Sequence, residues 1–122
     1  MSLDEDSKPA VPGRLAAIAQ GCRESGDYQP LLAELPYASF MDFEASVVDG
    51  RVRLRMPYAP MLVGNTALPA LHGGTLGACL EMAALLQLLH SARANRIPRT
   101  IDFTVDFLRP GRPVDTWADA EL

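Results

Sequence analysis

One stretch, Leu71–His90, constrains the fold of this chain more than any other. From Gly74 onward it reads as a helix, and before His90 its only side chains with polar heads are Thr75, Glu81 and Gln87. A helix that is apolar all round is normally buried. The stretch therefore predicts one long helix inside the core, with the other elements packed around it.

Two features of this helix point to chemistry. Gly73 and Gly74 open it, and the N–H groups of a first helical turn are available to an oxygen that carries negative charge. Glu81 is its only charged side chain before His90, and a buried carboxylate is costly unless a partner satisfies it or a reaction uses it. We weigh a catalytic acid or base against a structural hydrogen bond or ion pair, and the helix pattern leaves both open.

The spacing of these two features has a further consequence. Seven positions separate Gly74 from Glu81, which is about 10 Å along a helix axis. The two groups of one helix are therefore too far apart to serve the same reacting atom. If they act together, Glu81 must come from a second copy, which predicts a dimer with two antiparallel helices.

Length and charge narrow the class of protein. The chain has 122 residues, 48% of them hydrophobic and 21% charged, which suits one globular domain. We expect residues 1–12 to be a flexible arm and residues 13–122 a single domain. A net charge of −4 argues against nucleic acid or an anionic membrane as partner. Cys22 and Cys79 lack motif spacing, which favours free thiols in a reducing cytoplasm.

The rest of the chain predicts an antiparallel sheet preceded by helices. Apolar spacing indicates a helix over about 13–23 and further helical turns over 28–35, stopped by Pro36. Apolar and polar residues then alternate on both sides of Asp49-Gly50, a strong hairpin signal. The outer face of this hairpin carries acids on one strand and arginines on the other, which favours a solvated face with cross-strand pairs.

The second half of the sheet follows the long helix. Residues 57–69 read as a proline-containing loop, and residues 101–107 and 114–122 read as two further strands. This order predicts an α+β architecture, with an antiparallel sheet packed on one long helix.

Other chemical readings of the same residues are weaker. Cys79 as a nucleophile with His72 as base would require a reactive thiol in the middle of an apolar helix, where its pKa is raised and access is poor. His72, Cys79, Glu81 and His90 lack any familiar zinc-ligand spacing, so we expect no metal. Arg93, Arg96 and Arg99 follow the helix and either balance its C-terminal carbonyls or bind phosphates.

Taken together, the motifs resemble those of the hot-dog-fold thioesterases. The resemblance is carried by Asn65, by the run Leu71-His72-Gly73-Gly74, by the carboxylate nine residues after the histidine, and by the strand Thr100–Gly111 with its Leu-Arg-Pro ending. It covers residues 41–122 and is strongest for the phenylacetate-pathway branch, related to 4-hydroxybenzoyl-CoA thioesterase. It implies a hot-dog fold, in which a curved antiparallel sheet wraps one long buried helix.

The resemblance also implies that the pattern is C-terminally incomplete. Hot-dog domains usually continue with two further strands after the one that corresponds to 114–122. Either the sequence is a fragment or another chain completes the sheet, and the residues leave both open.

The implied activity is hydrolysis of an acyl-CoA thioester to a free acid and CoA. By this resemblance the Gly73 N–H polarises the thioester carbonyl, and Glu81 of the opposite subunit acts as base or nucleophile. Asn65 orients water or the carboxylate, His72 shapes the loop, and Thr100 helps to hold the water. Gly74 and Arg109 are expected to contact CoA, which is part of the substrate, and no other cofactor is expected.

The same resemblance implies a cytoplasmic homodimer or a dimer of dimers. It leaves open whether the acyl group is aromatic or of medium length. A rival from another class is a non-catalytic hot-dog module that binds acyl thioesters or serves in assembly. A hot-dog hydratase is a third reading, but those enzymes use an Asp and His pair on one loop, and His72 is followed by glycines.

Overall fold

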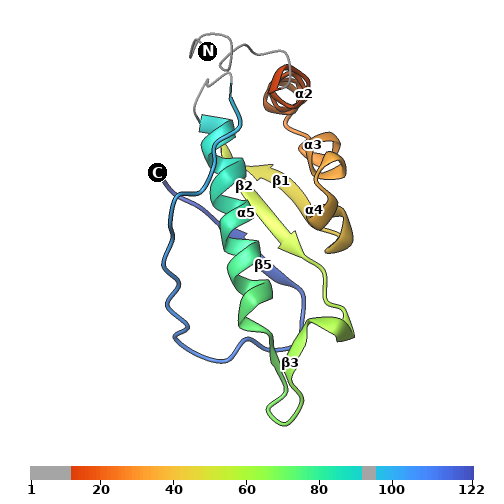
Figure 1. The fold of residues 1–122 in the computed structure, drawn as a ribbon, viewed down its shortest axis with the longest axis vertical. Coiled ribbons are helices and arrows are strands. Elements are labelled where there is room, and N and C mark those ends of the chain that lie inside the picture. Colours follow the sequence, from red (N-terminus) through yellow and green to blue (C-terminus); the bar gives the residue numbers. More distant parts are fainter. Residues whose placement is uncertain (1–11, 92–95) are drawn as a thin grey trace, which may run out of the picture.

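The computed structural model describes residues 12–91 and 96–122 (Figure 1). Arg93 and all but the last residue of the expected N-terminal arm, residues 1–12, lie outside the described residues. In chain order the elements are α2 (Pro12–Ser25), α3 (Gln29–Glu34), α4 (Pro36–Phe40), β1 (Glu44–Val48), β2 (Arg51–Met56), the 3-10 turn η1 (Pro60–Leu62), β3 (Val63–Asn65), β4 (Ala70–Leu71), α5 (Gly73–Ser91) and β5 (Thr116–Asp119). The predicted α+β class, with a long helix and an antiparallel sheet, is confirmed.

The helices before the sheet follow the sequence pattern with one exception. The predicted first helix is α2, and Gly26 ends it in the left-handed region, with φ +77° and its N–H donating to the Cys22 carbonyl. The predicted turns over 28–35 form α3, which ends at Glu34, before Pro36, as expected. The exception is α4, a further helix that the sequence pattern did not indicate. Proline has no N–H to lose in the first turn of a helix, and Pro36 begins α4 there after an extended Leu35.

The predicted hairpin is formed by β1 and β2. Asp49 and Gly50 both have positive φ, 52° and 75°, as the tight two-residue turn requires. The first strand begins at Glu44, later than the alternation suggested, because Asp42 lies in the left-handed region with φ 53°. Met41 and Phe43 are nevertheless buried beneath the sheet.

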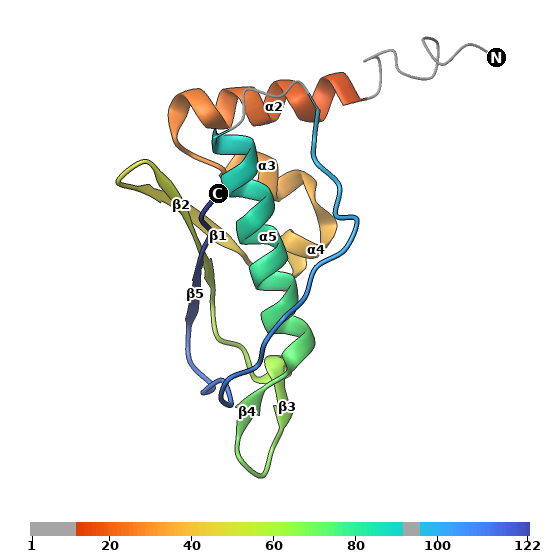
Figure 2. The same cartoon turned by 90° about the vertical axis from the view of Figure 1, so that its left-hand side faces the viewer.

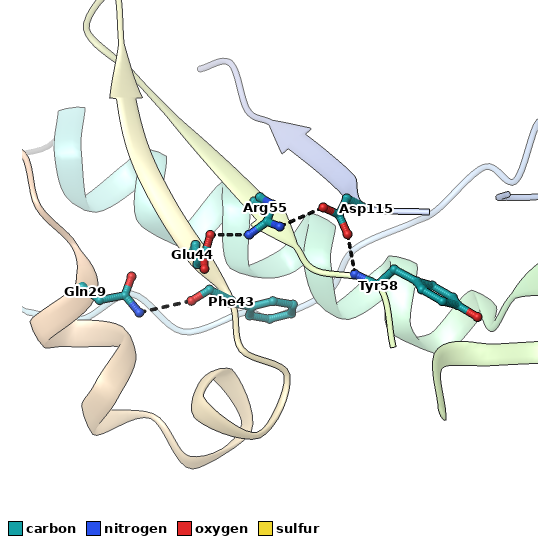
Figure 3. A network of polar contacts seen from close by, with 6 residues as sticks. All are labelled: Gln29, Phe43, Glu44, Arg55, Tyr58 and Asp115. Carbon is teal, nitrogen blue, oxygen red and sulfur yellow. Dashed lines mark hydrogen bonds and ion pairs between the residues drawn. The ribbon is translucent and has the colours of Figure 1, made fainter. Parts of the chain in front are cut away.

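The main sheet has the order β1-β2-β5, and both pairings are antiparallel. Val52, Leu54 and Met56 of the central strand are buried, and α5 packs across this face of the sheet. The outer face carries ion pairs, as predicted, but they are shared between two neighbours. Arg55 pairs with Glu44 of β1 and also with Asp115 (Figure 3). Arg53 pairs with Asp119 of β5.

Helix α5 begins one residue before the predicted start and runs to Ser91. Its buried side chains are Cys79, Ala83, Leu86, Gln87 and Leu89. Gln87 is the one that is polar: its Oε1 accepts the Val52 N–H at 2.7 Å, and its Nε2 donates to Ser91 Oγ at 2.7 Å. The polar residue that this helix buries among its apolar ones is therefore Gln87, which fastens the helix to β2.

The C-terminal end of α5 is held by the first helices. The hydroxyl of Tyr28, which is fully buried, lies 2.7 Å from Nδ1 of His90. Arg23 of α2 donates from Nε to the Leu89 carbonyl at 2.7 Å, which places a cation at the negative end of the helix. Burial raises the pKa of Tyr28 to about 12, so this hydroxyl stays protonated.

The chain after α5 departs from the prediction. We refer to residues 96–110 as the return segment, because they run back along α5 toward its N-terminal end (Figures 1 and 2). The strand expected over 101–107 is not formed: no described residue pairs with it. Ile101 is 99% exposed and Phe103 52% exposed. Alternation gave this segment an extended shape, but a strand also needs a neighbouring backbone.

Two further findings complete the fold. The predicted loop over 57–69 contains β3, which pairs with β4 just after the loop to form a small hairpin at the N-terminal end of α5 (Figure 2). Cys22 and Cys79 are buried free thiols, as expected. Among the described residues, no helix is long and apolar enough to cross a membrane.

Candidate functional site

His72 organises the start of α5. Its carbonyl accepts the N–H groups of Thr75 and Leu76, and its Nδ1 accepts the N–H of Gly74 at 2.8 Å. His72 is therefore the N-cap residue of α5. Because Nδ1 is the acceptor, the ring proton of the neutral imidazole lies on Nε2. The Gly74 N–H is thus occupied within the chain, and the expected contact of Gly74 with CoA stays a prediction.

Gly73 is the remaining donor at this helix end. No described residue accepts its N–H, which is the condition for binding a substrate oxygen. The ring of Phe107 covers the residue: a side chain at position 73 would lie 3.2 Å from its Cζ atom. Sequence reasoning missed Phe107 here, because it was read as one of several alternating residues of a strand.

The small hairpin brings its own residues to this place. The N–H of His72 donates to the Leu62 carbonyl at 2.7 Å, and a side chain at Gly64 would come within 2.8 Å of the His72 Cα. Only glycine permits so close an approach. Asn65 Oδ1 accepts the N–H groups of Ala67 and Leu68 at 2.9 and 3.1 Å, so this oxygen holds the hairpin turn.

Glu81 lies elsewhere, on the opposite side of α5 from the sheet. It is exposed in the described chain, so the expectation of a buried acid was wrong. The physical reason is that the sheet covers only one face of α5, while the return segment borders the other without covering it. Glu81 and Thr100 line the same cavity, of about 570 Å³, between α5 and the return segment.

This cavity is largely apolar, with two acidic residues, Glu81 and Asp102, in its lining. Its floor is formed by Leu80, Ala84, Leu85 and Leu88 of α5, and its wall includes Ile101 and Phe103 of the return segment. Arg99 also lines it, whereas Arg109 lines a second cavity, of about 330 Å³, between Leu76 and Trp117. Arg99 and Arg109, both candidates for contact with CoA, therefore lie at two different places.

The candidate residues thus form two groups on one helix. Asn65, His72 and Gly73 lie at its N-terminal end, and Glu81, which lines a cavity with Thr100, lies about 12 Å beyond Gly73 along the axis. Neither His72 nor Gly73 lines the cavity that contains Glu81. One chain therefore holds the two halves of the expected site apart.

Cys79 is poorly placed for chemistry. It is buried against the sheet, and burial raises the pKa of its thiol to about 11. The thiol is therefore protonated near neutral pH and is a weak nucleophile. Within residues 12–91 and 96–122, no three His, Cys, Asp or Glu side chains gather as metal ligands would.

Part of the chain is similar to known proteins. Residues 68–121 match a family model described as the Thioesterase superfamily, and this region contains the helix, Glu81, Thr100 and Arg109. Asn65 lies outside it. The mixed fold, with a long helix against an antiparallel sheet, agrees with a hot-dog thioesterase.

Particular relatives share part of this region. Over 66 aligned residues, the chain is 41% identical to proteins named medium/long-chain acyl-CoA thioesterase YigI from Escherichia coli, Salmonella typhimurium and Shigella flexneri. The alignment covers 43% of this chain and 43% of each relative. The chain thus spans less than half the length of the curated relatives it matches. No solved structure matches it significantly.

Proposed function

We propose that this protein is an acyl-CoA thioesterase, which hydrolyses an acyl thioester to a carboxylic acid and free CoA. The observation that carries the proposal is the division of α5 into an N-terminal donor and a solvent-accessible acid beside an apolar cavity. The match of residues 68–121 to the Thioesterase superfamily and the partial similarity to YigI support the same reaction.

The reaction assigns a task to each half. The Gly73 N–H binds the thioester oxygen, and it stabilises the charge that develops there when the carbonyl is attacked. Glu81 either removes a proton from the attacking water or attacks the carbonyl itself. The C–S bond then breaks, and CoA leaves as a thiol after taking up a proton. If Glu81 is the nucleophile, water then hydrolyses the anhydride between the acyl group and Glu81, which releases the acid and restores the carboxylate.

The two halves act together only across two subunits. Since Gly73 and Glu81 are about 12 Å apart along one helix, the acid that serves one Gly73 is supplied by a second chain. The return segment supports a partner, because Ile101, Phe107 and Leu108 are 99%, 59% and 89% exposed. We therefore infer a homodimer, or a homotetramer of two dimers.

The remaining residues take supporting roles. Thr100 holds the attacking water beside Glu81 in their shared cavity. His72 fixes the first helical turn and so the direction of the Gly73 N–H. Asn65 supports the hairpin beside this turn through its Oδ1 atom. Its amide nitrogen orients water or the carboxylate. Arg109 contacts CoA, and the reaction needs no cofactor besides the CoA of its substrate.

The acyl group and the location are inferred from other observations. The apolar cavity beside Glu81 favours a medium or long acyl chain, and so does the name of the YigI relatives, medium/long-chain acyl-CoA thioesterase. The motif resemblance to the phenylacetate-pathway branch favours an aromatic one, such as phenylacetyl. Two buried free thiols, Cys22 and Cys79, favour the cytoplasm.

The test is a thiol-release assay with the purified chain. The panel contains acyl-CoAs with straight chains of increasing length, together with phenylacetyl-CoA and benzoyl-CoA. Release of CoA from at least one member supports the hydrolase, and the preferred member decides between the two acyl classes. The rival function, a non-catalytic acyl-thioester-binding or assembly module, is favoured by the exposed return segment. It predicts binding of these compounds, by calorimetry, without release.

A further inference from the structure

The cavity beside Glu81 has a floor with helical periodicity. Glu81, Ala84, Leu85 and Leu88 occupy positions i, i+3, i+4 and i+7 of α5, and all four line the cavity. Residues with this spacing form one stripe on a helix. The floor therefore runs along the helix axis from the acid to Leu88, a length of about 10 Å. Such a shape fits an extended chain better than a compact ring.

Ala84 is the narrow side chain in this stripe. It is exposed and lies one helical turn beyond Glu81, between the acid and Leu88. The opposite wall is formed by Ile101 and Phe103 of the return segment. Every other α5 side chain that forms the apolar floor is a leucine, so position 84 is where the floor leaves most room.

We propose that Ala84 is a specificity-determining residue, which sets the length of the acyl chain that fits beyond Glu81. The proposal rests on the thioesterase function proposed above and adds a direction to it. The thioester carbon lies at Glu81, and the acyl tail runs over Ala84 toward Leu88. A short acyl group ends before Ala84, whereas a longer one must pass it.

The test compares Ala84→Leu with a matched control, Ala17→Leu. Both replace an exposed helical alanine by leucine, and both residues favour helices, but Ala17 lies on α2, away from this cavity. For each protein, kcat/KM is measured with butanoyl-CoA, octanoyl-CoA and palmitoyl-CoA by thiol release. The ratio between long and short substrates is compared within one protein, so a loss of folded enzyme cancels.

The expected result is a change of length preference. Ala84→Leu lowers kcat/KM for octanoyl-CoA and palmitoyl-CoA at least about tenfold relative to butanoyl-CoA, the discrimination that a few methylene groups give in a hydrophobic pocket. Ala17→Leu leaves the ratio unchanged. Leu88→Ala, which lengthens the floor, raises the ratio of palmitoyl-CoA to octanoyl-CoA.

Three outcomes overturn the inference, and they are distinguishable. An unchanged ratio in Ala84→Leu, with an active wild-type chain, shows that the tail does not pass this residue. An unchanged ratio in Leu88→Ala contradicts the direction of the tail, even if Ala84→Leu fails to fold. A wild-type chain that releases CoA from no member of the panel contradicts the proposed function and removes the basis of the inference.

Discussion

The two faces of α5 have similar sequences and different surroundings. One face, which includes Cys79, Ala83, Leu86 and Leu89, is packed against the rest of the core, and each of these four residues is at most 1% exposed. The other, formed by Leu80, Glu81, Ala84 and Leu88, faces a cavity and the return segment, and Leu80 is 45% exposed. Both faces are apolar, with one polar residue each.

The polar residue on each face of α5 matches the surroundings of that face. Gln87 lies on the sealed face, and its amide is satisfied by the Val52 N–H and the Ser91 hydroxyl. Glu81 lies on the open face and, among the described residues, forms no ion pair. A neutral amide suits burial because its donors and acceptor can all be paired, while a carboxylate suits a face reached by water or substrate. The sealed face therefore has a structural role, and the open face is the one to which the proposed reaction belongs.

Removing the charge from the open face should have the largest effect. Glu81→Gln keeps the shape of the side chain and leaves the fold intact because the residue is exposed. We expect thioester hydrolysis to fall roughly 10²–10⁴-fold, the contribution of a general base, with an unchanged thermal unfolding curve. The same substitution at Glu24, an exposed residue of α2, is the control. Unchanged turnover in Glu81→Gln would remove this residue from the mechanism.

A matched pair of leucines on the same helix tests the comparison directly. Leu86→Ala opens a cavity under β2, and we expect it to lower the free energy of unfolding by about 2–5 kcal/mol. Leu80→Ala makes the same chemical change on the open face and should cost no more than about 0.5 kcal/mol in dilute protein. Urea unfolding of both variants is the measurement. Equal losses would mean that the open face is covered in solution.

The buried amide gives a smaller effect. Gln87→Met preserves the length of the side chain but leaves the Val52 N–H without its acceptor. An unsatisfied buried donor costs about 1–3 kcal/mol, and we expect the free energy of unfolding to fall by that amount. Gln20→Met on α2, where the amide contacts only the exposed Glu24, should change it little. A Gln87→Met protein as stable as the wild type would show that water replaces this contact.

Much of this fold could be predicted from the sequence, because its signals are local. Turn chemistry at Asp49-Gly50 fixed the hairpin, and Gly26 fixed the end of α2. The run after His72 fixed the long helix. What failed was non-local: whether residues 101–107 become a strand depends on a neighbouring backbone, which no pattern within the segment reveals.

The candidate site was predictable in part for the same reason. Helix geometry separated Gly73 from Glu81 before any contact was known, and the structure keeps them apart. The exposure of Glu81 could not be predicted, because an apolar helix has the same sequence pattern whether one face or both are covered. Nor could the contact between His72 Nδ1 and the Gly74 N–H, which depends on one rotamer.

The smallest effect concerns the outer face of the sheet, far from α5, and depends on pH. Asp115 accepts the Tyr58 N–H and a hydrogen bond from Arg55, and these contacts lower the pKa of its carboxyl (Figure 3). A depressed folded-state pKa stabilises the protein above the unfolded value of about 3.9, and this contribution is lost as the pH falls through the folded value. Asp115→Asn should therefore lower Tm slightly at pH 6.

That difference should shrink as the pH is lowered toward 2.5, because the wild-type carboxyl then becomes neutral too. Asp119 is also lowered, by its hydrogen bonds from Arg53, but it is present in both proteins, so its contribution cancels in the comparison. Thermal unfolding of the pair between pH 6 and pH 2.5 measures the effect. A difference in Tm that stayed constant over this range would show that Asp115 acts through its shape and hydrogen bonds, and that its charge contributes nothing to stability.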